Sequence, residues 1–200
     1  TTSTTAVPAT ADTTTSSITP PPPPAPPGEA LLPPGAPLAP GERSFTAAFV
    51  GDILPHSPLW GQAQRNAGGE GYDFGPMLAP LRPLLDQADL AVCHLETPIA
   101  PDGEELSTAP LYGVPAEVVG AIRDAGFDRC STASNHTADR GVAGIDRTIA
   151  AFEHYGVAQS GMARTPAEIE PQVFHVGDVA VSHLSYTFSY NGLRLPAGQE

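Results

Sequence analysis

The chain has 200 residues and a formal net charge of −13, and all nine of its basic residues are arginine. Binding to a phosphate backbone requires clustered cations, so this composition argues against a nucleic-acid partner. No stretch approaches the roughly 18 apolar residues that a membrane span needs, so membrane proximity is expected only through a tether upstream of Thr1.

Residues 1–44 form a segment of low complexity, rich in threonine, serine and proline, and hold 12 of the 24 prolines. Such a composition cannot bury enough apolar surface to fold, and its proline-rich half favours an extended polyproline II conformation. We therefore expect residues 1–44 to be a disordered linker or stalk that holds a domain away from a surface. Residues 45–200 are expected to form the N-terminal portion of one domain.

From residue 45 onward, predicted strands alternate with predicted helices. A buried strand is expected over residues 45–50, and further strands are expected over residues 89–96, 127–134 and 157–161. Helices are expected over residues 77–87, with interruptions at Pro80 and Pro83, and over residues 115–127 and 144–156. Residues 172–186 read as two strands joined tightly at Gly177-Asp178. This alternation predicts a layered α/β fold in which helices pack on a largely parallel or mixed sheet.

Two cysteines, Cys93 and Cys130, fall late in two of the predicted strands. Neither belongs to a C-x-x-C pair, which excludes a zinc knuckle and a thioredoxin motif. Free cysteines are often buried, so two buried thiols are the favoured interpretation. A disulfide between the two strands is the alternative.

Polar side chains follow three successive predicted strands. Asp52 follows the first, Glu96 ends the second, and Asn135-His136 follows the third. If the strands are parallel, these four side chains converge at one edge of the sheet, where sites in α/β proteins gather. Each alone is weak evidence, but together they favour a site for a divalent metal ion, with Mn, Mg, Fe or Zn as candidates.

Several longer runs resemble the CapA family of capsule or poly-γ-glutamate biosynthesis proteins, within the calcineurin-like metallophosphoesterase superfamily. The similar runs are "VGDILPHS", "YDFGPML", "LLDQADLAVCHLETPI", "LYGVPAEVVGAIRDAGFDRCSTASNHTADRGVAGIDRTIAAFEHYGVAQSGMAR" and "LSYTFSYNGLRLP". They occur in family order from about Phe45 to Pro196. The most specific pieces are Asn135-His136 with Asp139 and Gly141, and the later segment containing Asn191-Gly192.

The resemblance implies a role for each matching residue. Asp52 corresponds to the first metal-binding aspartate, Glu96 stands in the place of a bridging aspartate, and Asn135 corresponds to a metal-ligating amide. His136 corresponds to the histidine that acts as a general acid or steadies the transition state. Asp139 is expected to contact His136 and orient it, as second carboxylates do at such sites.

The resemblance also implies a metallophosphoesterase-like fold, here lacking its C-terminal part, with Asn191 and Gly192 lining a substrate cleft. Where metallophosphoesterases carry a histidine two residues after the first aspartate, this chain has Leu54, and His56 lies four residues after Asp52. The remaining histidines, His94, His154, His175 and His183, are each interpreted as structural.

Three functions are consistent with these features. The first is a metal-dependent hydrolase acting on a phosphoester or on a linkage of an anionic polymer. The second is a non-catalytic component of an envelope polymer-synthase complex, and the third is a polymer-binding domain. The resemblance implies a bacterial, extracytoplasmic protein that is secreted or held at the cell surface and takes part in capsule or poly-γ-glutamate synthesis or export.

Overall fold

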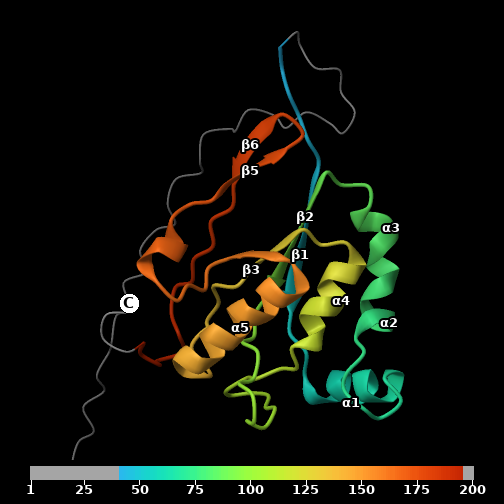
Figure 1. Ribbon diagram of the computed structural model, residues 1–200, viewed down its shortest axis with the longest axis vertical. Coiled ribbons are helices and arrows are strands. Elements are labelled where there is room, and N and C mark those ends of the chain that lie inside the picture. Colours follow the sequence, from blue (N-terminus) through green and yellow to red (C-terminus); the bar gives the residue numbers. More distant parts are fainter. Residues whose placement is uncertain (1–40, 196–200) are drawn as a thin grey trace, which may run out of the picture. The chain divides into compact units, whose positions relative to one another are not determined.

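The computed structural model describes residues 41–195 and contains a four-stranded sheet (Figure 1). Its strands are β1 (Ala47–Ile53), β2 (Leu90–Leu95), β3 (Arg129–Ser131) and β4 (Ala158–Ser160), in the spatial order β1-β2-β3-β4. Each neighbouring pair is parallel, which confirms the predicted α/β fold with a parallel sheet. The linker predicted over residues 1–44 falls almost entirely outside the described residues.

Helices connect the parallel strands, as the crossover between two parallel strands requires. They are α1 (Ser57–Asn66), α2 (Gly75–Leu78), the 3₁₀ turn η1 (Ala79–Leu81), α3 (Arg82–Leu85), α4 (Glu117–Ala125), α5 (Gly141–Tyr155) and the 3₁₀ turn η2 (Pro166–Ile169). The prolines of residues 77–87 divide that predicted helix into short turns, as expected. Helix α1 was missed, because its last six residues include only one apolar side chain, that of Ala63, and lead into a glycine-rich stretch.

One face of the sheet packs against α4 and α5, which lie beside each other (Figure 1). The side chains of Ala91, Cys93 and Leu95 point from β2 into this layer. They meet an apolar cluster of both helices that includes Val118, Val119, Ile122, Ala151 and Phe152. Gly126 and Gly156 end the two helices with positive φ angles of 101° and 72°, which only glycine adopts at little cost.

The opposite face of the sheet is covered in part by an antiparallel hairpin. Its strands β5 (Val173–Val176) and β6 (Val179–Ser182) are joined at Gly177-Asp178, as predicted. Val176 packs on Leu90 and Val92 of β2, and Phe174 and Val181 extend the contact. One face of β2 therefore packs against helices α4 and α5, and the other packs against the hairpin.

A bulge in β1 decides which face Asp52 occupies. Ala48 pairs with Ala91 of β2, but the register shifts between Phe49 and Asp52, so that Asp52 pairs with His94 and Ile53 pairs with Leu95. Without the shift, the alternation of the strand would turn Asp52 toward the helices. Asp52 thus lies near the end of β1, just after the bulge.

The two cysteines face each other across the middle of the sheet. Cys93 of β2 pairs in register with Cys130 of β3, with the Cα atoms 4.4 Å apart, and the two sulfurs are joined in a disulfide. Both residues are buried in the helical layer. The favoured prediction of two free thiols is therefore wrong, because the parallel register places these two residues directly opposite each other.

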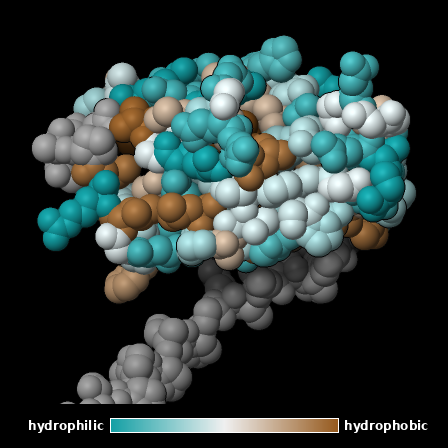
Figure 2. Space-filling view, turned by 90° about the horizontal axis from the view of Figure 1, so that it is seen from below, coloured by the Kyte–Doolittle hydropathy of each residue, from teal (hydrophilic) through white to brown (hydrophobic). Residues whose placement is uncertain are grey.

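The surface is consistent with the acidic composition. The face seen in Figure 2 is mostly hydrophilic, and its apolar residues form separate groups rather than one broad area. Within residues 41–195, none of the helices is both long and apolar enough to span a bilayer.

Candidate active site at the carboxyl end of the sheet

The loop after β3 is fixed against the end of β2 by short hydrogen bonds. The Ser134 hydroxyl donates to the carbonyl oxygen of Glu96, and the backbone N–H of His136 donates to the same hydroxyl at 2.9 Å. The Thr137 hydroxyl donates to the carbonyl of Thr132 at 3.0 Å. Serine and threonine therefore hold this loop in place, and they bring His136 beside Glu96.

His136 is oriented by a buried carboxylate. Its Nδ1 lies 2.7 Å from Oδ2 of Asp139, and the side chain of Asp139 is fully buried. The same oxygen accepts the backbone N–H of Tyr112 at 2.7 Å. A carboxylate at Nδ1 fixes the ring tautomer with its proton on Nδ1, which leaves Nε2 free to exchange a proton. The predicted contact between Asp139 and His136 is present.

Tyr112 lies beside His136, although the sequence did not indicate this residue as part of the site. Its ring packs edge-on against His136 with the centroids 4.6 Å apart, and its hydroxyl lies 3.2 Å from Nε2 of His56. Tyr112 is 5% exposed, so it seals one side of the His136 ring. We call His56, Tyr112, His136 and Asp139 the acid–base cluster. No sequence spacing links Tyr112 to His136, because the contact is made by a loop.

Arg140 fixes the loop that carries Tyr112. Its guanidinium donates to the carbonyl of Tyr112 at 3.1 Å, to the carbonyl of Glu105 and to the hydroxyl of Ser107, and it pairs with Glu104 at 2.8 Å. One side chain at the start of α5 thus organises the loop from Glu104 to Tyr112. Asp139 and Arg140 are adjacent in the chain, so the same turn orients His136 and holds the loop that covers it.

The carboxylate of Glu96 faces Nε2 of His136 at 3.9 Å, which is too long for a hydrogen bond. Only 14% of the Glu96 side chain is exposed, and its carboxylate accepts no hydrogen bond from the residues described. A sheltered carboxylate without a donor is costly unless a cation or water satisfies it. Glu96 therefore has the environment expected of a ligand to a cation.

Asp52 lies beside a different histidine. Its Oδ1 is 3.8 Å from Nε2 of His94, the residue with which it pairs in the sheet, and 63% of its side chain is exposed. His94 was interpreted as a packing residue, and the bulge in β1 is what brings the carboxylate to it. The carboxylates at this end of the sheet thus form two pairs, Asp52 with His94 and Glu96 with His136.

The predicted metal ligands fit a cation in kind but not in number. Carboxylate and amide oxygens are suitable donors for a hard divalent ion. However, residues 41–195 contain no group of three or more His, Cys, Asp or Glu side chains close enough to hold one. Metal binding by Asp52, Glu96 and Asn135 therefore stays a prediction.

The segment predicted to line a cleft reaches Asn135. The side-chain amide of Asn135 donates to Oδ1 of Asn191 at 3.4 Å, so the side-chain oxygen of Asn135 remains available as a ligand. Asn191 and Gly192 both adopt positive φ angles, 53° and 83°, in the turn that presents them. The structure thus brings Asn191 to Asn135, while the role of Asn191 and Gly192 in binding a substrate stays a prediction.

His183 occupies a polar position on the hairpin side of the sheet. Nε of Arg129 donates to its Nδ1 at 2.9 Å, and its Nε2 lies 3.0 Å from the Ser131 hydroxyl. Because Arg129 donates to Nδ1, the proton of the neutral ring lies on Nε2, which donates to Ser131. Burial lowers the pKa of His183, and the nearby Arg129 charge lowers it further. His183 is therefore neutral, and it cannot act as a base toward Ser131.

This lowered pKa predicts that the fold weakens in mild acid. The folded state takes up a proton on His183 only below the ordinary value of 6.5, whereas the unfolded chain takes it up near that value. Stability is therefore fully present above pH 6.5 and falls as the pH drops below it. In His183→Gln, the amide oxygen can accept from Arg129 and the amide nitrogen can donate to Ser131. Because this side chain does not titrate, the free energy of unfolding should depend less on pH in this variant. Urea unfolding between about pH 5 and pH 7.5 measures it. The exposed His175→Gln serves as the control, and an equal slope in both variants would contradict the prediction.

Comparison with known proteins supports the resemblance. The family model "Bacterial capsule synthesis protein PGA_cap" matches residues 46–199, which include both carboxylate pairs, the acid–base cluster and the Asn191-Gly192 turn. No curated protein matches the chain. Because the model covers more than half of the chain, this protein belongs to the bacterial capsule synthesis protein family PGA_cap.

Proposed function

We propose that this chain works in capsule synthesis or export as an extracytoplasmic hydrolase that uses His136 for acid–base catalysis. The observation that carries the proposal is the geometry of His136. Its Nδ1 is held at 2.7 Å by the buried Asp139, and its Nε2 faces Glu96 at the carboxyl end of a parallel sheet. Its substrate would be a phosphoester or a linkage of an anionic capsule polymer.

His136 would exchange a proton at Nε2. In the neutral ring, Nδ1–H stays bonded to Asp139 while the Nε2 lone pair accepts a proton, and the charged ring can then return that proton to a leaving group. Asp139 would stabilise the positive ring that forms in between. Tyr112 and the loop held by Arg140 would keep water from one side of the ring, which preserves the tautomer.

A divalent ion would complete this site. Asp52, Glu96 and the amide oxygen of Asn135 are the residues that would hold Mn, Fe, Zn or Mg, with further ligands from water or from parts of the protein beyond these three. When bound, such an ion supplies an activated water and stabilises negative charge on the substrate. The Glu96 carboxylate, which lacks a hydrogen-bond donor among the described residues, is the feature that favours this set.

An extracytoplasmic location is supported by family membership and by the disulfide. Structural disulfides persist in oxidising compartments and are rare in the cytosol. The bond between Cys93 and Cys130 joins the two central strands of the sheet, so its formation contributes to the fold. We place the protein at the bacterial cell surface or in the secreted fraction, where it would work with an envelope polymer-synthase complex.

Metal analysis tests the proposal. Purified protein loaded with Mn²⁺ and then dialysed should retain bound metal by elemental analysis and should slowly hydrolyse bis(p-nitrophenyl) phosphate. Asp52→Ala should lose both metal and activity, because it removes one of three protein donors. Asp146→Ala, which removes an exposed carboxylate of α5, should keep both. Protein that binds no divalent metal would refute the hydrolase proposal and favour a non-catalytic role in the assembly.

A further inference from the structure

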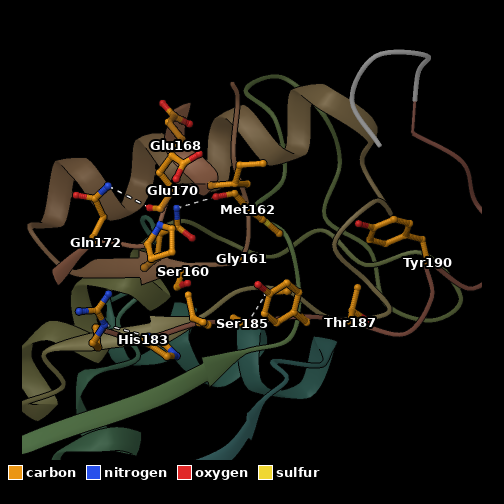
Figure 3. Close-up of a pocket in the computed structure, with 17 residues that line it drawn as sticks. Ser160, Gly161, Met162, Glu168, Glu170, Gln172, His183, Ser185, Thr187 and Tyr190 are labelled. Carbon is orange, nitrogen blue, oxygen red and sulfur yellow. Dashed lines mark hydrogen bonds between the residues drawn. The ribbon is translucent and has the colours of Figure 1, made fainter. Parts of the chain in front are cut away.

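A second polar site lies away from the acid–base cluster, in a pocket of about 360 Å³ beside β3 and β4. Figure 3 shows its two walls. Glu168 and Glu170 lie on one side, His183 and Ser185 lie on the other, and Ser160 lies between them. Arg129 also lines this space, which we call the Arg129 pocket. Its volume falls in the range of pockets that hold small molecules.

Arg129 is an unusual cation in this chain. It is 6% exposed, and it is the one buried arginine of the described residues. Partly sheltered arginines elsewhere are paired with carboxylates, Arg140 with Glu104 and Arg147 with Asp102. Arg129 has no carboxylate within 4.0 Å among residues 41–195. A buried charge without a counter-charge is costly to maintain.

The contacts of Arg129 with the described residues leave four of its five N–H donors unused. Nε donates to His183 at 2.9 Å, and the guanidinium carbon lies 4.1 Å above the ring of Phe174. The two terminal nitrogens donate no hydrogen bond to any residue that the structure describes. Asp128 is near enough to favour the charged guanidinium, but its carboxylate accepts the backbone N–H of Ala91 at 2.7 Å. Because Arg129 lines the pocket, these unused donors are the ones that it can offer to a ligand there.

His183 and Phe174 hold the guanidinium in one orientation. His183 is itself fixed by Ser131, so the Nε bond cannot turn freely, and stacking on Phe174 sets the plane of the group. A planar guanidinium held in this way presents two parallel N–H donors, which match the two oxygens of a carboxylate or phosphoryl group. Such preorganisation favours binding, because little side-chain entropy remains to be lost.

From this geometry we infer that the Arg129 pocket binds a small ligand through a single oxyanion, a carboxylate or a phosphoryl group. The opposite wall limits what the rest of the ligand carries. Glu168 is paired with Arg164, which also pairs with Glu153. Glu170 is exposed without a cation beside it among the described residues. A second anionic group would be repelled there, so the remainder of the ligand is neutral or positively charged. This inference does not depend on the hydrolase proposal.

Binding of matched probes to the whole protein tests the inference. N-acetylglycine supplies a carboxylate, N-acetylglycinamide is its neutral counterpart, and glycerol 3-phosphate with glycerol forms the phosphoryl pair. Each is titrated into ¹⁵N-labelled protein while the Nε–H signal of Arg129 is followed by NMR. At least one anion should shift that signal and saturate, and its neutral counterpart should not. The anion that binds more tightly shows whether the pocket prefers a carboxylate or a phosphoryl group. Equal responses to an anion and its neutral counterpart, or no response to any probe, would overturn the inference.

Two variants separate a ligand-binding role from a structural one. Arg129→Lys keeps the charge but loses the planar pair of donors, so affinity for the anion should fall at least about tenfold. Arg65→Lys, at an exposed arginine of α1, should bind as the original chain does. If Arg129→Lys does not fold, the variant Glu170→Gln tests the inference instead. Glu170→Gln removes an exposed negative charge from the opposite wall of the pocket, so the affinity for the anion should rise about twofold. Unchanged affinity in Glu170→Gln, or in folded Arg129→Lys, would refute the inference.

Discussion

Replacing His136 with alanine is expected to lower phosphodiesterase activity by about 10²- to 10⁴-fold, which is the usual contribution of a positioned acid–base group. The reason is that Nε2 of His136 is the atom that exchanges a proton in the mechanism we propose. Metal content should be nearly unchanged, because Asp52, Glu96 and Asn135 remain. Initial rates with bis(p-nitrophenyl) phosphate, with metal content measured on the same samples, check this result. Unchanged activity in His136→Ala would remove this residue from the mechanism.

The Asp139→Asn variant separates the negative charge of the carboxylate from mere presence of the imidazole. The amide oxygen can still accept the N–H groups of Tyr112 and His136, but it carries no negative charge to stabilise the protonated ring. We expect a loss of at least about 100-fold in kcat with little change in KM. Tyr112→Phe is the matched control, because it keeps the ring contact and the backbone N–H to Asp139 and loses only the bond to His56. It should retain most of the activity, and equal losses in both variants would contradict this role for Asp139.

Loss of the disulfide is expected to have the largest effect on stability. The bond links residues 37 positions apart, and cross-linking a chain over such a distance contributes about 4 kcal/mol in the loop-entropy model. Urea unfolding of the oxidised protein should therefore have a clearly higher midpoint than unfolding of the same chain kept reduced. This comparison changes no side chain, so no cavity contributes to the difference.

A thiol count tests the bond directly. Denatured protein that has never met a reductant should show no free thiol, and the same sample after reduction should show two. Detection of two thiols before reduction would mean that Cys93 and Cys130 are unpaired. Equal unfolding midpoints with and without reductant would mean that the bond contributes nothing to stability.

The sequence predicted the positions of the strands well because parallel strands and their helices leave clear patterns. The prediction that the first strand is buried was wrong, because β1 lies at the edge of the sheet and contains no buried residue. The apolar runs around Phe49, Val92 and Cys130 lie in the three strands expected for them, and the glycines at 126 and 156 end α4 and α5 as expected. The hairpin at Gly177-Asp178 was equally clear, since turn residues separate two short apolar strands. Helix α1 lacked such a pattern, and it was missed.

The candidate site was predictable only where neighbours in sequence are neighbours in space. His136 and Asp139 share one turn, so their contact followed from spacing. Tyr112 reaches His136 through a loop held by Arg140, and His183 meets Arg129 across 54 residues. Contacts of this kind depend on how separate elements pack, which residue spacing does not encode. The pairing of Cys93 with Cys130 likewise required the register between two strands, and a pattern of apolar residues does not fix that register.

The bulge in β1 lets this strand carry one residue more than its partner strand without moving Asp52 from its face. Asp52 and Ile53 reach their proper faces because one additional residue is accommodated between Phe49 and Asp52. Deleting Gly51 would remove that residue and leave a regular ladder, in which Asp52 still pairs with His94 and Ile53 still pairs with Leu95. A homologue with one residue fewer between the positions of Phe49 and Asp52 would therefore keep its carboxylate in the same place.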